Sequence, residues 1–476
     1  MRSGDDGIAT GRVRRAAPLA GMAARATGDA VIAALRRDRE PGSHSTTNFA
    51  KRADRYVETL GASKGAIMKV GQLLSFIPMG AAVPAEYQKI FQAAMSRLQS
   101  DAPPMAPDLA ARVVREELGE PPDAAFAHFE PMPFAAASIG QVHRARTRDG
   151  RDVAVKVQYP GVAEAIKADL ENAELLSVLI GLMRSLFPRV TGIDPKVVAK
   201  EVSARVSEEL DYRLEARNQQ AFADAYRGHP FIRIPEVVSE LSAAKVLTQD
   251  LAHGRTLYEA MDADQGLRDQ WGEAIFRFAF GSLRRLGIFN ADPHPGNYLF
   301  GEDGSVTFLD FGCVKHFDAH QILLIQDVVR AVVIGDGELL RRTFIASGLF
   351  EPDTAPSAQD CLDWYRVPLR LLTEGEPIRI TPEHVARVIE TEFSPVGPAR
   401  EIVSKMHAAS DFIFLMRVDV GLMSVLGALE PIGPWGGIQG ELDFLDPPCS
   451  ALGEQEADFW GDRYPLPTPP AYAARR

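Results

Sequence analysis

The sequence predicts an α+β fold in which a helical N-terminal extension is followed by a small strand-rich lobe and a large helical lobe. Three changes of pattern support this prediction. Apolar residues up to about position 120 recur at helical spacing, residues 134–158 read as short strands, and the chain after Gly254 is again mostly helical. With 476 residues and 46% hydrophobic content, the chain can fill the cores of a two-lobed protein.

The expected domain boundaries follow these changes. The end of the chain has six prolines between Pro447 and Pro470 and is expected to be irregular. We therefore divide the sequence into four segments: a tail and helical extension over residues 1–120, a strand-rich lobe over 121–254, a helical lobe over 255–442 and a Pro-rich tail over 443–476.

Three helices are predicted in the N-terminal extension. Ser63 is placed to cap a helix over residues 63–77, whose apolar positions form one stripe. A second helical run covers residues 85–98. A third covers residues 107–118, and it begins with a proline in its first turn and ends at a glycine.

A hairpin is predicted next. Asp149-Gly150 is a strong turn signal between the alternating residues 141–145 and the apolar run 153–157. A helix is then expected to begin at residues 194–195, before strand-like sequence over 232–251.

A second hairpin interrupts the helical lobe. A Pro/Gly-rich loop follows residue 290, and Asp303-Gly304 forms the turn signal before the apolar strand 306–309. This hairpin is expected to lie within otherwise helical sequence.

Charge and cysteine usage exclude several classes of protein. A net charge of −12 and a pI near 5.4 argue against an ordinary nucleic-acid binder, which presents clustered positive charge to phosphates. The three cysteines are far apart and form no CxxC pair, so neither a disulfide framework nor a cysteine zinc site is predicted. The longest apolar stretch, residues 413–426, is interrupted by Arg417 and Asp419, so no transmembrane helix is predicted. These features favour a cytoplasmic protein.

The first 39 residues have three interpretations. We prefer a flexible, solvated tail. A basic amphipathic helix, with Arg12 and Arg14 beside apolar Leu19, would instead allow peripheral contact with an anionic membrane. A cleaved targeting segment is disfavoured because Asp5 and Asp6 interrupt the basic sequence.

Three motifs together predict phosphoryl-transfer chemistry, which needs a cation on the nucleotide phosphates, oxygen ligands for magnesium and a carboxylate near the acceptor. Lys156 ends the strand motif VAVK, where a phosphate-pairing lysine is expected. Asp292 and Asn297 have the D-x-x-x-x-N spacing of a catalytic loop, in which the Asp orients the nucleophile and the Asn binds magnesium. Asp310 begins a DFG motif after an apolar strand and is the main candidate for metal ligation.

Each motif alone is weak. A lysine in an apolar strand can extend its amine to solvent, and short Asp-containing motifs arise by chance. Their order, and their position in the predicted strands and loops, make the combination specific for a protein-kinase-like fold. His294, inside the loop motif, is expected to stabilise the loop by hydrogen bonding rather than to bind metal.

The usual Gly-rich phosphate loop is absent before the Lys156 strand. Its place is taken by an Ala-rich segment, for which we expect nucleotide contact at Ala135, Ala136, Ala137 and Ser138. Alanine does not reach left-handed conformations cheaply, so this segment should be stiffer than a glycine loop.

These motifs resemble the UbiB/AarF atypical kinase family over roughly residues 50–330. The similar segments are residues 135–143 (AAASIGQVH), 155–162 (VKVQYPGV) and 291–297 (ADPHPGN). Two further segments agree with it, namely residues 69–72 (KVGQ), which resemble the family's K-x-G-Q motif, and residues 209–212 (ELDY), which resemble its E-x-D motif. Without the resemblance, both would be read as solvated helix charges.

The resemblance implies an N-terminal extension that covers the cleft through Lys69 and Gln72, so that protein substrates are excluded. Glu209 and Asp211 would help to hold this extension. It also implies that Glu215 pairs with Lys156 and that ATP binds between the lobes with Mg²⁺. The adenine is expected near Asp250 to Ala252. A role in isoprenoid-quinone or other lipid metabolism follows by the same analogy, whereas the substrate and the oligomeric state stay open.

The sequence departs from the family pattern at two places. Asn290 stands where related sequences often have His, and residues 249–252 (QDLA) replace a more usual Met-Glu pair at the presumed hinge. No A-P-E motif follows Gly312, so activation through a phosphorylated loop is not supported.

Two other functions remain open. The chain could be a nucleotide-binding pseudokinase that scaffolds a lipid-biosynthetic complex, but retention of Lys156, Asp292 and Asp310 argues against this. It could instead be a small-molecule kinase resembling aminoglycoside or choline kinases, which would leave the KVGQ helix unexplained.

Overall fold

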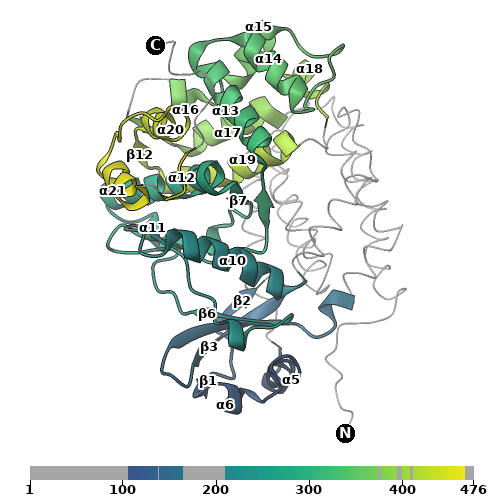
Figure 1. Cartoon of the computed structure of the whole chain (residues 1–476), viewed down its shortest axis with the longest axis vertical. Helices are drawn as coiled ribbons and strands as arrows, with labels where there is room; N and C mark the ends of the chain where they lie inside the picture. Colours follow the sequence, from purple (N-terminus) through teal and green to yellow (C-terminus); the bar gives the residue numbers. More distant parts are fainter. Residues whose placement is uncertain are drawn as a thin grey trace, which may run out of the picture. The chain divides into compact units, whose positions relative to one another are not determined.

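The computed structural model describes residues 105–137, 139–164, 210–373, 377–393, 399–407, 411–461 and 463–466. The chain divides into two compact units (Figure 1). Among the described residues, the strand-rich unit contains 105–164, 210–214 and 237–251, apart from residue 138, and the helical unit contains the rest. This arrangement confirms the predicted α+β fold. Three predicted helices lie outside the described residues: those over 63–77 and 85–98, and the one beginning at 194–195. Of the third helix, only Leu210 is described.

The strand-rich unit is built on an antiparallel sheet. Its strand order is β1-β3-β4-β6, with β2 also paired to β3; the strands are β1 (His128–Phe129), β2 (Ala135–Ala137), β3 (Gly140–Arg146), β4 (Asp152–Gln158) and β6 (Val246–Asp250). Gly150 has φ +93° in the turn between β3 and β4, which confirms the hairpin predicted there. The apolar residues of β4 are buried, as its sequence indicated.

Two helices accompany this sheet, α5 (Pro107–Leu118) and α6 (Pro122–Ala125). The bounds of α5 confirm the prediction. Its C-terminal Gly119 adopts φ +83°, and its N–H donates to the Arg115 carbonyl at 2.9 Å. Apolar residues of α5 are buried, and the helix packs against β4 and β6.

A buried polar network gives two residues of the AAASIGQVH segment a structural role. Gln141 accepts a hydrogen bond from the Met105 N–H at 2.8 Å and contacts His143 Nε2 at 2.9 Å. His143 Nδ1 lies 2.8 Å from the Glu130 carbonyl, and burial lowers the pKa of His143. These two side chains therefore connect β3 to its flanking segments as neutral groups.

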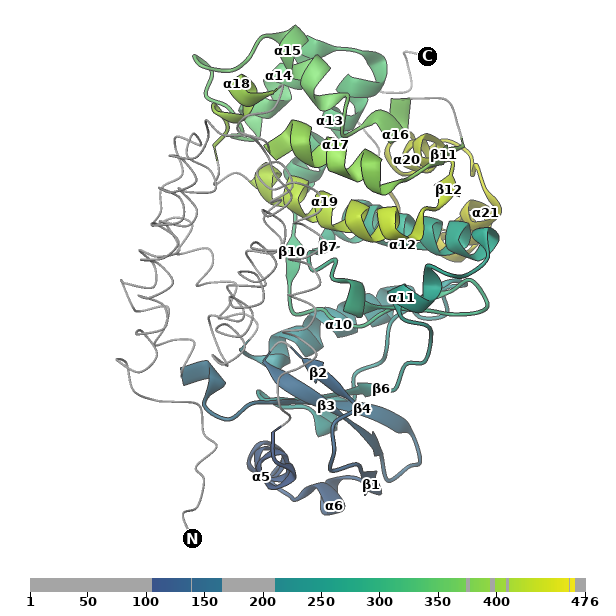
Figure 2. The ribbon, with the colours of Figure 1, turned by 180° about the vertical axis from the view of Figure 1, so that it is seen from behind.

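The helical unit begins within α10 (Tyr212–Tyr226), since Glu215 is its first residue in this unit. Its longer helices are α12 (Gln265–Leu286), α13 (Ala319–Ile334), α14 (Gly337–Ala346), α15 (Ala358–Tyr365), α17 (Pro382–Phe393) and α19 (Asp411–Leu429). Shorter ones are α11 (Leu257–Ala260), α16 (Arg370–Thr373) and α18 (Arg400–Val403). Helix α19 packs against α12 and α17 (Figure 2).

The helical unit also contains several short strands. β5 (Ile232–Arg233) pairs parallel to β9 (Val306–Phe308), which pairs antiparallel to β8 (Tyr298–Phe300). β7 (Ile288–Asn290) pairs with β10 (Val314–His316), and β11 (Ile378–Arg379) pairs with β12 (Ile432–Gly433). Gly304 has φ +81° between β8 and β9, so the second predicted hairpin is also confirmed.

The β5–β9 pairing has a consequence for the domain boundaries. Residues 215–236 belong to the helical unit, whereas 237–251 return to the strand-rich unit. This division differs from the continuous strand-rich lobe predicted over 121–254, because the pairing of β5 with β9 joins segments that are far apart in the sequence.

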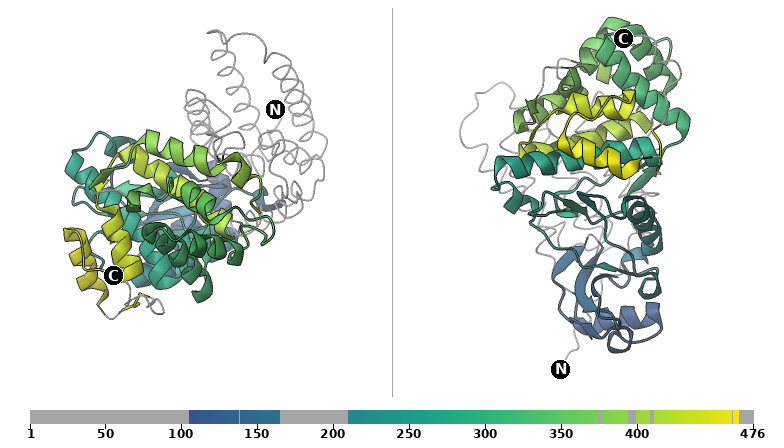
Figure 3. Two further views of the ribbon diagram at one scale, coloured as in Figure 1. Left: turned by 90° about the horizontal axis from the view of Figure 1, so that it is seen from above. Right: turned by 60° about the vertical axis from the view of Figure 1, so that its left-hand side comes forward.

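The C-terminal segment was expected to be irregular, and this expectation is wrong for residues 451–460. They form α21 (Ala451–Trp460), which follows α20 (Trp435–Phe444), and both helices pack against α12 (Figure 3). Trp460 is buried in the main core. Ser450 caps α21 by accepting a hydrogen bond from the Gly453 N–H at 3.0 Å.

A buried ion network fixes these last helices. Arg277 of α12 contacts Glu273 and Glu441 at 2.7 Å and Glu456 at 2.9 Å. Burial opposes the charged form of Arg277, but its hydrogen bonds to Glu441 and the neighbouring carboxylates outweigh burial and raise its pKa. Across the described part of the chain, every helix is too short or too polar to span a bilayer.

Candidate nucleotide and metal site

The β8–β9 hairpin brings two predicted magnesium ligands together. Tyr298 pairs with Phe308, and the Leu309 N–H donates to the Asn297 carbonyl at 3.0 Å. Asn297 directly precedes β8, and Asp310 follows two residues after β9. The strand register therefore places these two residues at the same end of the hairpin.

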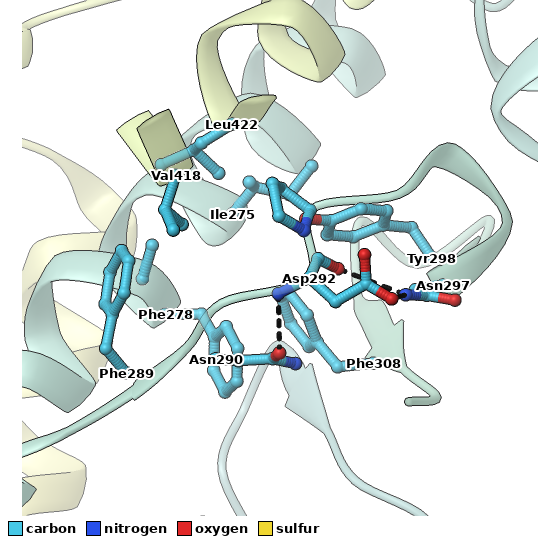
Figure 4. A pocket seen from close by; sticks show the side chains of 12 residues that line it. Ile275, Phe278, Phe289, Asn290, Asp292, Asn297, Tyr298, Phe308, Val418 and Leu422 are labelled. Carbon is cyan, nitrogen blue, oxygen red and sulfur yellow. Dashed lines mark hydrogen bonds between the residues drawn. The ribbon is translucent and has the colours of Figure 1, made fainter. Parts of the chain in front are cut away.

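The loop before β8 is held by its own side chains. Asn297 Nδ2 donates to the Asp292 carbonyl at 3.1 Å and to Asp292 Oδ2 at 3.0 Å (Figure 4). His294 Nδ1 accepts from the Gly296 N–H at 3.1 Å, which starts the short 3-10 helix η3 (Pro295–Asn297). His294 thus stabilises the loop by hydrogen bonding, as predicted.

The DFG segment is anchored beside this loop. Asp310 Oδ1 accepts from the Gly312 N–H at 2.9 Å, a contact that orients the carboxylate. Phe311 is fully buried, and its ring lies 5.0 Å from that of Phe222. Asn218 Nδ2 also donates to the Phe311 carbonyl at 3.1 Å, so α10 supports this segment.

Asn290 joins the two loops, a role that the sequence reasoning missed. Its Nδ2 donates to the Asp310 carbonyl at 2.9 Å, and its Oδ1 accepts from the Asp292 N–H at 3.3 Å. The sequence analysis identified this position only as one where related sequences often have His. Its position two residues before Asp292 was the sequence signal available for this role.

Apolar side chains lie behind the loop of residues 292–297. A small cavity of about 10 Å³, the scale of one water molecule, lies beside Asp292 and Asn290 and is otherwise lined mainly by residues of α12, α19 and nearby strands (Figure 4). Tyr298, on its wall, is buried, and burial together with the Asp292 carboxylate raises the pKa of its hydroxyl. One side of the loop is therefore a low-dielectric environment, which strengthens electrostatic interactions nearby.

The donor atoms fit magnesium. Both candidate ligands offer oxygen, which this hard cation prefers. Because the amide nitrogen of Asn297 donates to Asp292, its amide oxygen is the atom that can bind a cation. The carboxylate of Asp310 is oriented by the backbone of its own motif.

The strand-rich unit positions the predicted phosphate-binding lysine. Lys156 lies in the middle of β4, opposite Val142 of β3 and Leu247 of β6. Its Nζ lies 5.0 Å from the ring centroid of Tyr212, a distance typical of a cation–π contact. Sheet pairing on both sides and an aromatic ring thus constrain this side chain.

The Ala-rich segment forms a strand rather than an open loop. Ala135 and Ala136 are exposed and Ala137 is half-buried, and Ala137 pairs with Gly140 across a tight turn. A side chain at Gly140 would clash with the Val157 carbonyl and approach Tyr212 Oη within 2.9 Å, so this position requires glycine. Ser138 lies outside the described residues.

The remaining predicted residues are distributed as follows. Asp250 ends β6 and forms an ion pair with Arg151. Ala252 is the first residue of the chain after the strand-rich unit.

Glu215 is buried in the first turn of α10, and Asp211 accepts from the Arg213 N–H at 3.0 Å just before that helix. Lys69, Gln72 and Glu209 lie outside the described residues.

Comparison with known sequences finds a matching domain and several similar proteins. A family described as "ABC1 atypical kinase-like domain" matches residues 97–343. Atypical kinase COQ8B, mitochondrial, of Rattus norvegicus is 33% identical over 343 residues, which cover 70% of this chain and 62% of the rat protein. Atypical kinase coq-8, mitochondrial, of Caenorhabditis elegans is 33% identical over 290 residues, 60% of this chain and 37% of the nematode protein. The chain therefore spans less than two thirds of these relatives.

A solved structure is also similar. It contains Rv3197 of Mycobacterium tuberculosis in complex with erythromycin, and it matches with a TM-score of 0.59 and 32% sequence identity. The match covers 85% of this chain and 99% of the mycobacterial chain.

Proposed function

Because the chain belongs to the ABC1 atypical kinase-like family, the family of the UbiB/AarF resemblance, we propose that it is an ATP-dependent phosphotransferase or ATPase. The observation that carries this proposal is the arrangement of Asp292, Asn297 and Asp310. Three separate contacts hold these residues: the β8–β9 register, the Asn297 amide and the Asn290 side chain. Such positioning of oxygen ligands and a carboxylate is what phosphoryl transfer requires.

Each residue then has a role. Asn297 and Asp310 would hold Mg²⁺, which supplies positive charge to the nucleotide phosphates. Asp292 would orient the accepting hydroxyl or water. Lys156, paired with Glu215, would bind the phosphates, and the exposed Ala-rich strand at Ala135 and Ala136 would contact them through its backbone.

The class of molecule on which the ATP-dependent reaction acts is proposed from the family. Relatives carry the names COQ8B and coq-8, and the UbiB resemblance implies ubiquinone biosynthesis. We therefore propose an isoprenoid-quinone or other lipid intermediate at a membrane surface. Phosphorylation of proteins in trans is not part of this proposal, because the resemblance implies that the N-terminal extension excludes them.

Thermal unfolding with and without Mg-ATP tests nucleotide binding, since a ligand that binds the folded state raises the unfolding temperature. We expect a shift in the wild type that is much reduced in Asp310→Asn and Lys156→Ala. Gln359→Ala, which removes an exposed amide on α15, serves as the control and should shift like the wild type.

Hydrolysis of ATP, measured with and without lipid vesicles, tests the reaction. We expect turnover in the wild type and its loss in Asp310→Asn. If both proteins bind ATP and the measured hydrolysis is the same for the two, with and without vesicles, hydrolysis does not depend on Asp310, and a nucleotide-binding scaffold replaces the enzymatic proposal.

A small-molecule kinase is the second candidate, favoured by the erythromycin complex of the mycobacterial relative. Erythromycin is a direct probe of this idea. An additional, saturable shift of the unfolding temperature by erythromycin, together with erythromycin-dependent ADP release, would favour it over a lipid-directed function.

A further inference from the structure

We infer that Asn290 is a positioning residue that sets the metal-binding carboxylate of Asp310 relative to the catalytic loop. The inference rests on the proposed function, because it assigns Asp310 to Mg²⁺.

The first argument is the pair of hydrogen bonds. Asn290 Nδ2 donates to the Asp310 carbonyl at 2.9 Å, and Asn290 Oδ1 accepts from the Asp292 N–H at 3.3 Å. One planar amide therefore connects the peptide after the proposed metal ligand to the peptide before the proposed nucleophile-orienting carboxylate. Since one contact needs a donor and the other an acceptor, only one orientation of the amide satisfies both.

The second argument is the backbone on either side. Asn290 pairs with Val314 where β7 meets β10, and the Ala291 N–H donates to the Cys313 carbonyl at 2.8 Å. The backbone pairing of β7 with β10 therefore fixes the positions of these two segments relative to each other, and Asn290 is the last paired residue of β7. The Asn290 side chain adds a further link between these segments, because it reaches past the last paired residue and donates to the Asp310 carbonyl.

The third argument concerns the carboxylate itself. Asp310 Oδ1 accepts from the Gly312 N–H at 2.9 Å, so the side chain is oriented by the same short turn whose carbonyl Asn290 holds. Rotation of the Asp310 peptide would move this turn and the carboxylate together. Groups that orient a metal ligand in this way typically change metal affinity or activity by about 10- to 100-fold when removed.

The test is a magnesium titration of ATP binding, followed by the unfolding temperature or a fluorescent ATP analogue. Asn290→Ala removes both contacts, and Asn290→Asp removes the donor but keeps an acceptor toward Asp292. We expect both variants to raise the half-saturating Mg²⁺ concentration by about 10-fold or more. Binding of ATP in EDTA should stay within about twofold of the wild type, because the lysine side of the site is unchanged.

Two controls separate this role from general destabilisation. Asn290→His restores one donor and one acceptor and should recover part of the Mg²⁺ affinity, and Gln359→Ala should match the wild type. If Asn290→Ala and Asn290→Asp fold and show wild-type Mg²⁺ dependence while Asp310→Asn loses it, Asn290 has no positioning role. Wild-type protein whose ATP binding ignores Mg²⁺ would instead overturn the proposed function and this inference with it.

Discussion

The helical unit contains two polar networks that are held together by different means. One is formed by the loops around Asp292 and Asp310, and the other is the buried cluster around Arg277. In the loops, the carboxylates receive hydrogen bonds from neutral donors, Asn297 Nδ2 and the Gly312 N–H. In the cluster, one guanidinium directly contacts three carboxylates at 2.7 to 2.9 Å.

The difference separates function from stability. Neutral donors orient a carboxylate without themselves cancelling its charge, which suits the role of cation ligand proposed for this site. In the core, the attraction between the Arg277 guanidinium and the surrounding carboxylates helps to hold α20 and α21 against α12. Substitutions in the loops should therefore change ligand binding, whereas substitutions in the cluster should change folding.

The largest effect is expected for Arg277→Met. Removing the guanidinium leaves Glu273, Glu441 and Glu456 close together without their cation, and breaking such a buried network costs about 3–5 kcal/mol of unfolding free energy. Urea denaturation measures this loss. The exposed pair of Arg112 with Glu116 provides the control, because Arg112→Met should leave the transition midpoint unchanged. Equal midpoints for both variants would contradict the assignment of the cluster to stability.

The next effect is on turnover. Asp310→Asn removes the charge from the proposed metal ligand, and we expect a loss of about 100- to 1000-fold in kcat/KM for ATP. Without nucleotide, its unfolding free energy should change by less than about 1 kcal/mol, since the asparagine side chain keeps an oxygen that can accept the hydrogen bond from the Gly312 N–H. A large loss of stability in this variant would remove the contrast between the two networks.

A smaller effect is expected in the strand-rich unit, where Lys156 contacts the ring of Tyr212 at 5.0 Å. Tyr212→Leu removes this cation–π contact, which is worth about 0.5–2 kcal/mol, and should raise the Kd of ATP about 2- to 30-fold. Tyr212→Phe retains the ring and should bind ATP almost normally. If the Phe and Leu variants bind equally, the ring does not position the lysine.

The smallest effect concerns buried acids. Burial, with a contribution from Asp419, raises the pKa of Glu392 well above its usual value, and burial raises the pKa of Asp419 to about 7. A carboxyl whose folded pKa is raised binds more protons in the folded state, so the wild type should lose stability as pH rises from about 4 through 7. Glu392→Gln does not ionise and should unfold at a higher temperature than the wild type at pH 8, with the difference shrinking at pH 5. A pH-independent difference would show that ionisation is not the cause.

Local sequence signals predicted much of the fold. The bounds of α5 followed from a proline at its start and Gly119 after its end, and both hairpins followed from their Asp-Gly turns. These features depend on neighbours in the chain, so a single sequence contains the information that they need.

Long-range pairing was harder to predict. The β5–β9 contact moves residues 215–236 into the helical unit, and no local pattern reports it. Prolines around α21 obscured that helix, although Ser450 was a cap signal at its start. The site motifs were found from their spacing, but Asn290 was not, because its role depends on two backbone groups brought together by the fold.

Calorimetric titration of ATP into the wild-type protein, with Mg²⁺ and then with EDTA, tests the central claim most directly. If Asn297 and Asp310 hold a cation on the nucleotide, binding should be at least about 10-fold tighter with Mg²⁺, and Asp310→Asn should lose this gain. Identical binding under both conditions, or an undiminished gain in Asp310→Asn, would contradict the account.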